Sequence, residues 1–175
     1  MTARRTALAL VVHEAEPLVA DYRRRYDSDA VARRIPPHVT VVFPFAPAES
    51  ATADLLASLR DLYAEVPAFD FALVRVDRFE EHVWLAPDPS DRFVALTELT
   101  AARFPRWPPY EGAFEKVIPH LTVGCGKNTD AMALAARDEI GSGLPIPGTA
   151  HGVTLLGEQA DGSWAELTTF GLGAR

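Results

Sequence analysis

The sequence predicts an α+β fold with antiparallel sheets and helices outside them. Strand-like runs alternate with amphipathic helical segments, and short turns join neighbouring strands, as in antiparallel hairpins. A second observation is a repeat: the pattern apolar–Pro–His–apolar–Thr–Val occurs at His38 and again at His120, about half of the 175-residue chain apart. No linker rich in Ser or Gly divides the chain. We therefore expect residues 1–175 to form one domain with two lobes.

The first half of the chain predicts two strands and two helices. The short uncharged apolar run at 6–12 indicates a buried strand. Apolar residues at helical spacing over 16–26 predict a helix that places Arg23, Arg24 and Arg25 on its solvated face, with phosphate binding as the alternative role. A polar connection at 27–34 leads to the strand that contains His38. Ser50 is expected to cap the next helix, which Pro67 ends.

The second half predicts two hairpins and two helices. Strands at 69–77 and 82–86 meet at a turn, and Trp84 on the second either packs in the core or stacks on a base. Ser90 opens a helix, and Asn128 or Thr129 caps another that Gly141 ends. Strands at 153–156 and 164–170 form the last hairpin. The total is seven or eight strands and four helices.

The two repeated strings predict strands that carry the chemistry. Alternation places His38 and Thr40 on one face of the first strand, and His120 and Thr122 on one face of the second. The other three histidines lack a hydroxyl two residues later. Two strands that each present a histidine and a hydroxyl indicate a two-histidine active site. The opposite faces are expected to be apolar, formed by Val39, Val41 and Phe43 in one strand and by Leu121, Val123 and a buried Cys125 in the other.

One irregular stretch, residues 104–119, leads directly into the second motif. Prolines at 105, 108 and 109 exclude a regular helix or a central strand. The loop contains Trp107, Tyr110 and Phe114, whose rings either clamp a substrate base or cap the core.

The two motifs, with the longer strings HVTVVFPF and PHLTV, resemble those of the two-histidine (2H) phosphoesterase superfamily. That superfamily includes 2′-5′ RNA ligase-like proteins and cyclic nucleotide phosphodiesterases, and the resemblance extends over most of the chain. It implies a LigT-like fold of two pseudo-symmetric lobes of antiparallel sheet with outer helices around a central cleft. It also implies substrates with 2′,3′-cyclic phosphates or 2′-5′ linkages. Aromatic residues in the corresponding loop of related proteins favour substrate binding by Tyr110 and Phe114.

The residue types fit phosphodiester cleavage that needs neither a metal nor another cofactor. Histidine titrates near neutral pH, so one ring can accept a proton while the other donates one. We expect His38 and His120 to be this acid–base pair, without an assignment of which is the acid. The hydroxyls of Thr40 and Thr122 are expected to bind the non-bridging phosphate oxygens, and Lys127, shortly after the second motif, is the candidate for a cation that assists them.

Composition limits the partners. The net charge of −7 argues against an extended nucleic-acid surface and favours a nucleotide or an RNA end. A single cysteine excludes an internal disulfide, and no apolar run approaches the roughly 20 residues that span a membrane. The first twelve residues favour a strand over a signal peptide, because His13 and Glu14 interrupt the apolar run. We expect a cytoplasmic monomer.

Three alternatives stay open. A metal hydrolase would usually supply a third protein ligand, which His-x-Thr does not provide. A binding module would recognise a nucleotide phosphate without turnover. Reversible 2′-5′ RNA ligation would use the same groups as hydrolysis, and fold analogy does not choose between them.

Overall fold

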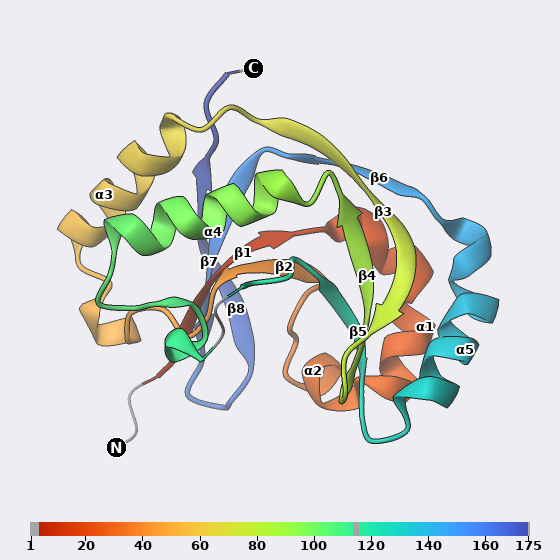
Figure 1. Cartoon of the computed structure of the whole chain (residues 1–175). Coiled ribbons are helices and arrows are strands. Elements are labelled where there is room, and N and C mark those ends of the chain that lie inside the picture. Colours follow the sequence, from red (N-terminus) through yellow and green to blue (C-terminus); the bar gives the residue numbers. More distant parts are fainter. Residues whose placement is uncertain (1–3, 114–115, 175) are drawn as a thin grey trace.

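The computed structural model describes residues 4–113 and 116–174. Its centre is one curled antiparallel sheet of eight strands in the order β6-β3-β4-β5-β2-β1-β7-β8 (Figure 1). The two motif strands, β2 and β5, are neighbours in the middle of this sheet. The boundary between them divides the sheet into two groups of four strands, β6-β3-β4-β5 and β2-β1-β7-β8. The predicted α+β arrangement of antiparallel strands with outer helices is confirmed.

The elements follow the expected order along the chain. Its first half contains β1 (Thr6–Val11), η1 (His13–Ala15), α1 (Glu16–Tyr26), α2 (Ser28–Ala32), β2 (His38–Val42), η2 (Ala48–Ser50), α3 (Ala53–Ala64) and β3 (Phe69–Arg78). The second half contains β4 (His82–Asp88), α4 (Asp91–Arg103), η3 (Pro109–Gly112), β5 (Leu121–Cys125), α5 (Thr129–Glu139), η4 (Gly141–Gly143), β6 (Ile146–Ala150), β7 (Gly152–Glu158) and β8 (Trp164–Gly171).

The two faces of the sheet differ. The four longer helices pack on one face, with α1 against β5, α4 against β2, α3 against β8 and α5 against β3 and β4. Most of the buried apolar side chains lie between these helices and the sheet. The other face, which we call the open face, has a smaller apolar cluster formed mainly by Ala7, Ala9, Leu156 and Trp164. No described helix is both long and apolar enough to cross a membrane.

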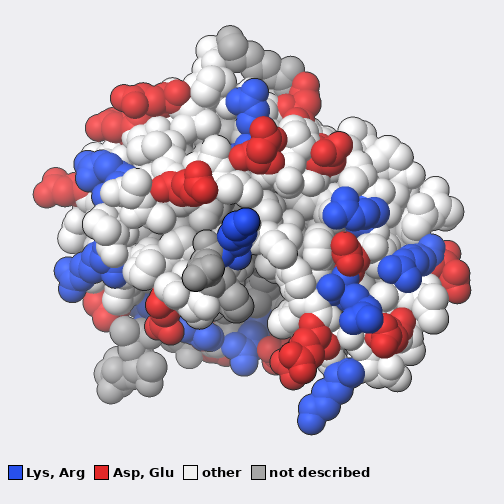
Figure 2. Space-filling model, viewed as in Figure 1, with Lys and Arg blue, Asp and Glu red and all other residues white. Residues whose placement is uncertain are grey.

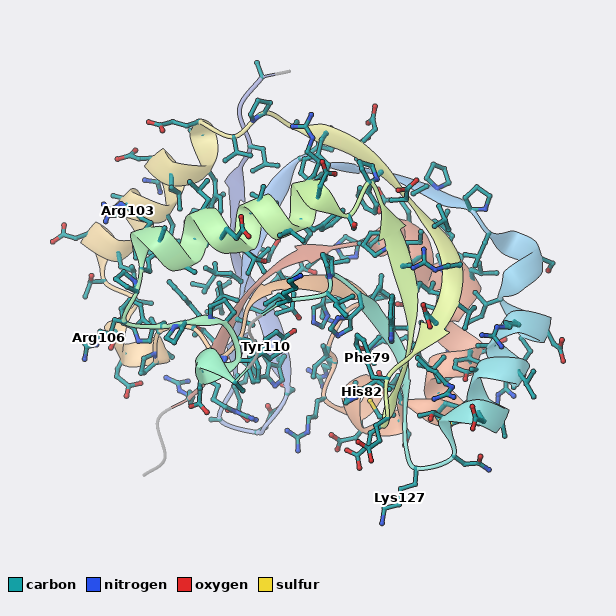
Figure 3. All side chains as sticks on the ribbon, in the orientation of Figure 1. Phe79, His82, Arg103, Arg106, Tyr110 and Lys127 are labelled. Carbon is teal, nitrogen blue, oxygen red and sulfur yellow. The ribbon has the colours of Figure 1, made fainter. Side chains whose placement is uncertain are left out.

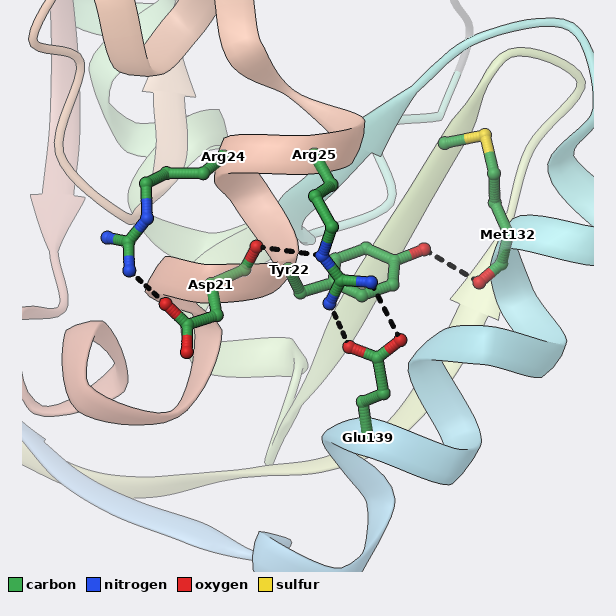
Figure 4. A network of polar contacts seen from close by, with 6 residues as sticks. All are labelled: Asp21, Tyr22, Arg24, Arg25, Met132 and Glu139. Carbon is green, nitrogen blue, oxygen red and sulfur yellow. Dashed lines mark hydrogen bonds and ion pairs between the residues drawn. The ribbon is translucent and has the colours of Figure 1, made fainter.

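The arginine run of α1 has three different roles. Arg25 forms an ion pair with Glu139 of α5, and Arg24 pairs with Asp21 on its own helix (Figure 4). The adjacent Tyr22 is fully buried and donates its hydroxyl to the Met132 carbonyl at 2.6 Å. The prediction that Arg23 lies on the solvated face of this helix is wrong, because only 4% of its side chain is exposed. The helix is therefore buried over a wider arc than its apolar spacing indicates.

A β-bulge follows each motif and overturns the directions that strict alternation predicts for Val42, Phe43 and Cys125. The register of β1 with β2 pairs Ala9 with Thr40 but Leu8 with Val42, so one extra residue bulges between them. The bulge moves Val42 into the main core and Phe43 to the open-face cluster, opposite to the predicted alternation. A matching shift occurs in β5, where Trp84 pairs with Thr122 and Val83 with Gly124. Cys125 is consequently exposed, not buried.

Local signals misplaced some other elements. Thr52, not Ser50, caps α3 by accepting a hydrogen bond from the Leu55 N–H. Ser90 does occupy the N-cap position of α4, but its side chain makes no capping bond. Strand β6 was not predicted because Pro147 and Gly148 interrupt its apolar pattern. The short helix α2 was not predicted because its segment is polar.

Candidate active site

The sheet register brings the two motifs together on the open face. Val39 pairs with Leu121 across the β2–β5 junction, and both side chains lie in the main core. In an antiparallel pair, the residues that flank such a pair point to the other face. Continuing the same register places His38 opposite Thr122 and Thr40 opposite His120. The two histidines are then diagonal neighbours, which are typically roughly 7–8 Å apart, a separation that leaves room for a phosphate.

Both imidazoles are held in the same way. The His38 Nδ1 lies 2.8 Å from the Pro36 carbonyl oxygen, and the His120 Nδ1 lies 2.7 Å from the Ile118 carbonyl oxygen. A carbonyl only accepts, so Nδ1 must carry the proton in each ring. In the neutral ring the free lone pair is therefore on Nε2. Each motif thus presents one nitrogen that can take up or release a proton while the other fixes the ring.

The surroundings lower the pKa of both histidines. Burial is the main cause in each case, because it disfavours the charged imidazolium. The carbonyl bonds oppose this effect by stabilising the charged form. Nearby positive charge lowers the pKa further, from Arg23 and His120 in the case of His38, and from His82 in the case of His120. Both rings are consequently biased toward the neutral form in the free protein.

Aromatic side chains enclose His120. The Phe79 ring meets it edge to face at a centroid separation of 5.1 Å, and the Trp84 ring lies at 5.9 Å. Phe79 and Trp84 also contact each other at 4.8 Å. Trp84 is buried, and its indole N–H has no hydrogen-bond partner among the described residues. Sequence reasoning missed Phe79, because it stands at the start of a polar turn and outside any motif.

Tyr110 approaches the first motif from η3, on the other side of the open face from Phe79 (Figure 3). Its N–H donates to the Phe43 carbonyl at 2.7 Å, and its hydroxyl forms a hydrogen bond with Thr40. Burial raises the pKa of this phenol, and the bond to Thr40 partly offsets that rise. Of the two loop aromatics that the sequence favours for substrate binding, the structure therefore brings Tyr110 to the motif. Phe114 lies outside the described residues.

Arg23 supports the loop that precedes His38. Its guanidinium donates to the Ile35 carbonyl at 2.8 Å and lies 3.7 Å from the Asp27 carboxylate, which is also buried. Burial raises the pKa of Asp27, whereas Arg23 and a hydrogen bond with Cys125 lower it. Arg23 thus holds the backbone at Ile35 in place. The carbonyl of the next residue, Pro36, orients the His38 ring.

Lys127 is not brought to the motifs. It is exposed at the tip of the β5–α5 turn, beyond the end of β5 remote from His120, and its side chain points away from the sheet (Figure 3). Among residues 4–113 and 116–174, no three His, Cys, Asp or Glu side chains gather in a metal-binding arrangement. On the face shown in Figure 2, basic and acidic side chains are interspersed, and neither sign forms a continuous patch.

The curled eight-stranded sheet and the paired His-x-Thr strands define the class of the protein, that of the two-histidine phosphoesterases. A model of the 2′-5′ RNA ligase superfamily matches residues 11–162, and the chain belongs to this family. A protein of Geobacillus kaustophilus that is named a putative phosphoesterase is 27% identical over 158 residues, covering 88% of this chain and 87% of that protein. A second of that name, from Halalkalibacterium halodurans, is 29% identical over 167 residues and covers 90% and 91%.

Solved structures share the fold at low sequence identity. The apo crystal structure of LigT from E. coli has a TM-score of 0.62 and 17% identity, covering 99% of both chains. The structure of TT0787 from Thermus thermophilus has a TM-score of 0.61 and 16% identity, covering 98% of this chain and 99% of that one. These likenesses establish the LigT-like fold that the resemblance of the motifs implied.

Proposed function

We propose that this protein is a metal-independent phosphodiesterase that opens 2′,3′-cyclic phosphates or cleaves 2′-5′ linkages at nucleotide or RNA ends. The observation that carries the proposal is the matched pair of histidines. Each ring donates from Nδ1 to the carbonyl two residues before it, and both stand on the open face of adjoining strands. Purely binding a phosphate does not require two such proton carriers.

The reaction on a cyclic phosphate needs one water molecule. The neutral histidine removes a proton from the water through Nε2, and the oxygen attacks phosphorus. The protonated histidine gives its Nε2 proton to the ribose oxygen as that bond to phosphorus breaks. The product is a phosphate monoester, and the two rings have exchanged protonation states. Either histidine fits either role by geometry.

The threonines and Tyr110 are assigned to the phosphate. The hydroxyls of Thr40 and Thr122 donate to the non-bridging oxygens, where negative charge grows during attack. Tyr110 positions the Thr40 hydroxyl through their hydrogen bond. The structures of LigT from E. coli with NADP+, 3′-AMP and ATP support a nucleotide as the ligand of this site. If the 5′ hydroxyl of a second RNA end replaced water as the nucleophile, the same groups would join it to the 2′ oxygen through phosphorus and release the 3′ oxygen, which is 2′-5′ ligation, and product analysis distinguishes the two reactions.

The pH dependence of kcat/KM should be bell-shaped with its maximum below about pH 6.5. Below both pKa values no base is present, and above both no acid is present. Since both histidine pKa values are lowered from 6.5, the interval between them lies on the acid side of that value. Initial rates on a 2′,3′-cyclic nucleotide across pH 4–9 test this. A maximum above pH 7 would contradict the assignment.

Replacing Thr40 or Thr122 by Val should lower kcat/KM by about 10²-fold, because each change removes one donor to the developing charge. Val preserves the branched shape on the strand, so the free energy of unfolding should change little. Thr40→Ser and Thr122→Ser are the matched controls and should stay within about fivefold of the wild type, since the hydroxyl remains. Equal losses in the Val and Ser variants would indicate a packing role.

A further inference from the structure

A basic hollow lies next to the candidate active site. Its volume is about 510 Å³, and its lining includes Arg4 and Arg5, which immediately precede β1, and Arg106 after α4. The rest of the lining is mainly apolar, formed by Pro44, Phe45, Pro47, Trp107 and Pro108, with Glu111 as the one acidic residue. This volume falls within the range of small-ligand pockets. Three guanidinium groups thus converge from two distant segments of an acidic chain.

Two of these cations are free to meet an anion. Arg5 is held by a bidentate pair with Glu158, at 2.9 and 3.1 Å, and is thereby neutralised. In the described part of the chain, Arg4 and Arg106 have no acidic partner within ion-pair distance. Both are exposed, and the Arg106 guanidinium lies over the Trp107 ring at 5.5 Å. Stacking orients that cation without satisfying its hydrogen-bond donors.

One segment separates the hollow from the histidine pair. In η3, Tyr110 faces Thr40 of the first motif, whereas Pro108 and Glu111 on either side of it line the hollow. The residues that follow β2 also lie between the two sites. The Phe43 carbonyl accepts a hydrogen bond from the Tyr110 N–H, and the next residue, Pro44, lines the hollow. A ligand that spans this wall would touch both sites. Figure 3 shows Arg106 on the outer side of the loop and Tyr110 on the inner side.

We propose that this hollow binds a second phosphate, and the nucleotide unit attached to it, of an oligonucleotide whose end reacts at the histidine pair. Arg4 and Arg106 would hold that phosphate, and the apolar lining with Trp107 would accept the base or ribose. The inference rests on the proposed function, which it narrows: the preferred substrate is a short oligonucleotide end with at least two phosphates. A mononucleotide would occupy only the reactive site.

The test compares two substrates and two variants. Initial rates are measured on a 2′,3′-cyclic mononucleotide without a 5′ phosphate and on a trinucleotide that ends in a 2′,3′-cyclic phosphate. The variants are Arg4→Ala/Arg106→Ala and the matched control Arg103→Ala, an exposed arginine that stacks on Phe104 and does not line the hollow. Binding of a fluorescent trinucleotide with a 3′-phosphate is measured in parallel by anisotropy at several salt concentrations.

The double variant should lose at least tenfold in kcat/KM on the trinucleotide, mainly through KM, and stay within twofold on the mononucleotide. Its salt dependence of binding should also weaken, by about 0.7 in log–log slope for each phosphate contact removed. Equal rates on both substrates in the wild type, or equal losses in the double variant, would overturn the inference while leaving the proposed function intact. Arginine-dependent trinucleotide binding without turnover would overturn the function and keep the subsite.

Discussion

Replacing either His38 or His120 by Ala should lower kcat/KM on a 2′,3′-cyclic nucleotide by about 10²–10⁴-fold, with little change in KM. Each change removes the only group placed to move one of the two protons, and a methyl group cannot take its role. The loss in the double variant should be much smaller than the product of the two single losses, because the pair acts as a unit. Steady-state kinetics of the three variants in EDTA measure this.

His151→Ala is the matched control for the histidine variants. This histidine is exposed in the connection between β6 and β7, away from β2 and β5, so its replacement should leave the rate within about twofold. Circular dichroism spectra and thermal midpoints confirm that each variant is folded. Full activity in either His38→Ala or His120→Ala would contradict the assignment of that residue.

Replacing Arg23 by Met should destabilise the protein by about 3 kcal/mol near neutral pH. The change leaves the buried Asp27 carboxylate without its cation and removes the donor to the Ile35 carbonyl. Met keeps much of the length and apolar stem of the side chain, so the loss of stability comes mainly from the missing charge and hydrogen bond. Urea denaturation followed by tryptophan fluorescence measures the change.

The dependence of this loss on pH identifies its source. Burial already raises the folded-state pKa of Asp27 above its ordinary value, and without Arg23 it should rise further. A group with a raised folded pKa stabilises the fold at low pH, and that contribution is lost as pH rises through the folded pKa. Arg23→Met should therefore be less stable than Arg23→Met/Asp27→Asn at pH 7, and the difference should shrink in acid. A constant difference would indicate packing alone.

The motifs could be predicted because local sequence determines them. Alternation places His38 with Thr40 and His120 with Thr122 before any tertiary structure is known, and the preceding Pro residues mark where the strands begin. The antiparallel class follows from short turns between strands. The pairing of the two motif strands in one continuous sheet is a long-range property. The family resemblance anticipated two lobes around a cleft, and it did not anticipate that β2 and β5 are neighbours in a single sheet.

The bulges and the supporting residues could not be predicted in this way. A bulge after Thr40 and another after Thr122 arise from pairing with β1 and β4, so period-two alternation assigns Phe43 and Cys125 to the wrong face. Arg23 appears solvent-exposed in sequence because its burial depends on a loop twelve residues away. Phe79 is positioned by the β3–β4 hairpin against His120, which immediately precedes β5, and no local pattern records that contact.

The most direct test of the central claim is the hydrolysis of a 2′,3′-cyclic nucleotide in EDTA, with product identification by ³¹P NMR, for the wild type and for His38→Ala/His120→Ala. Two-histidine catalysis predicts that the wild type opens the ring to a single monoester isomer without a metal, and that the double variant is slower by at least about 10²-fold. Turnover that persists at the wild-type rate in the double variant, or that appears in the wild type only when a divalent metal is added, would contradict it.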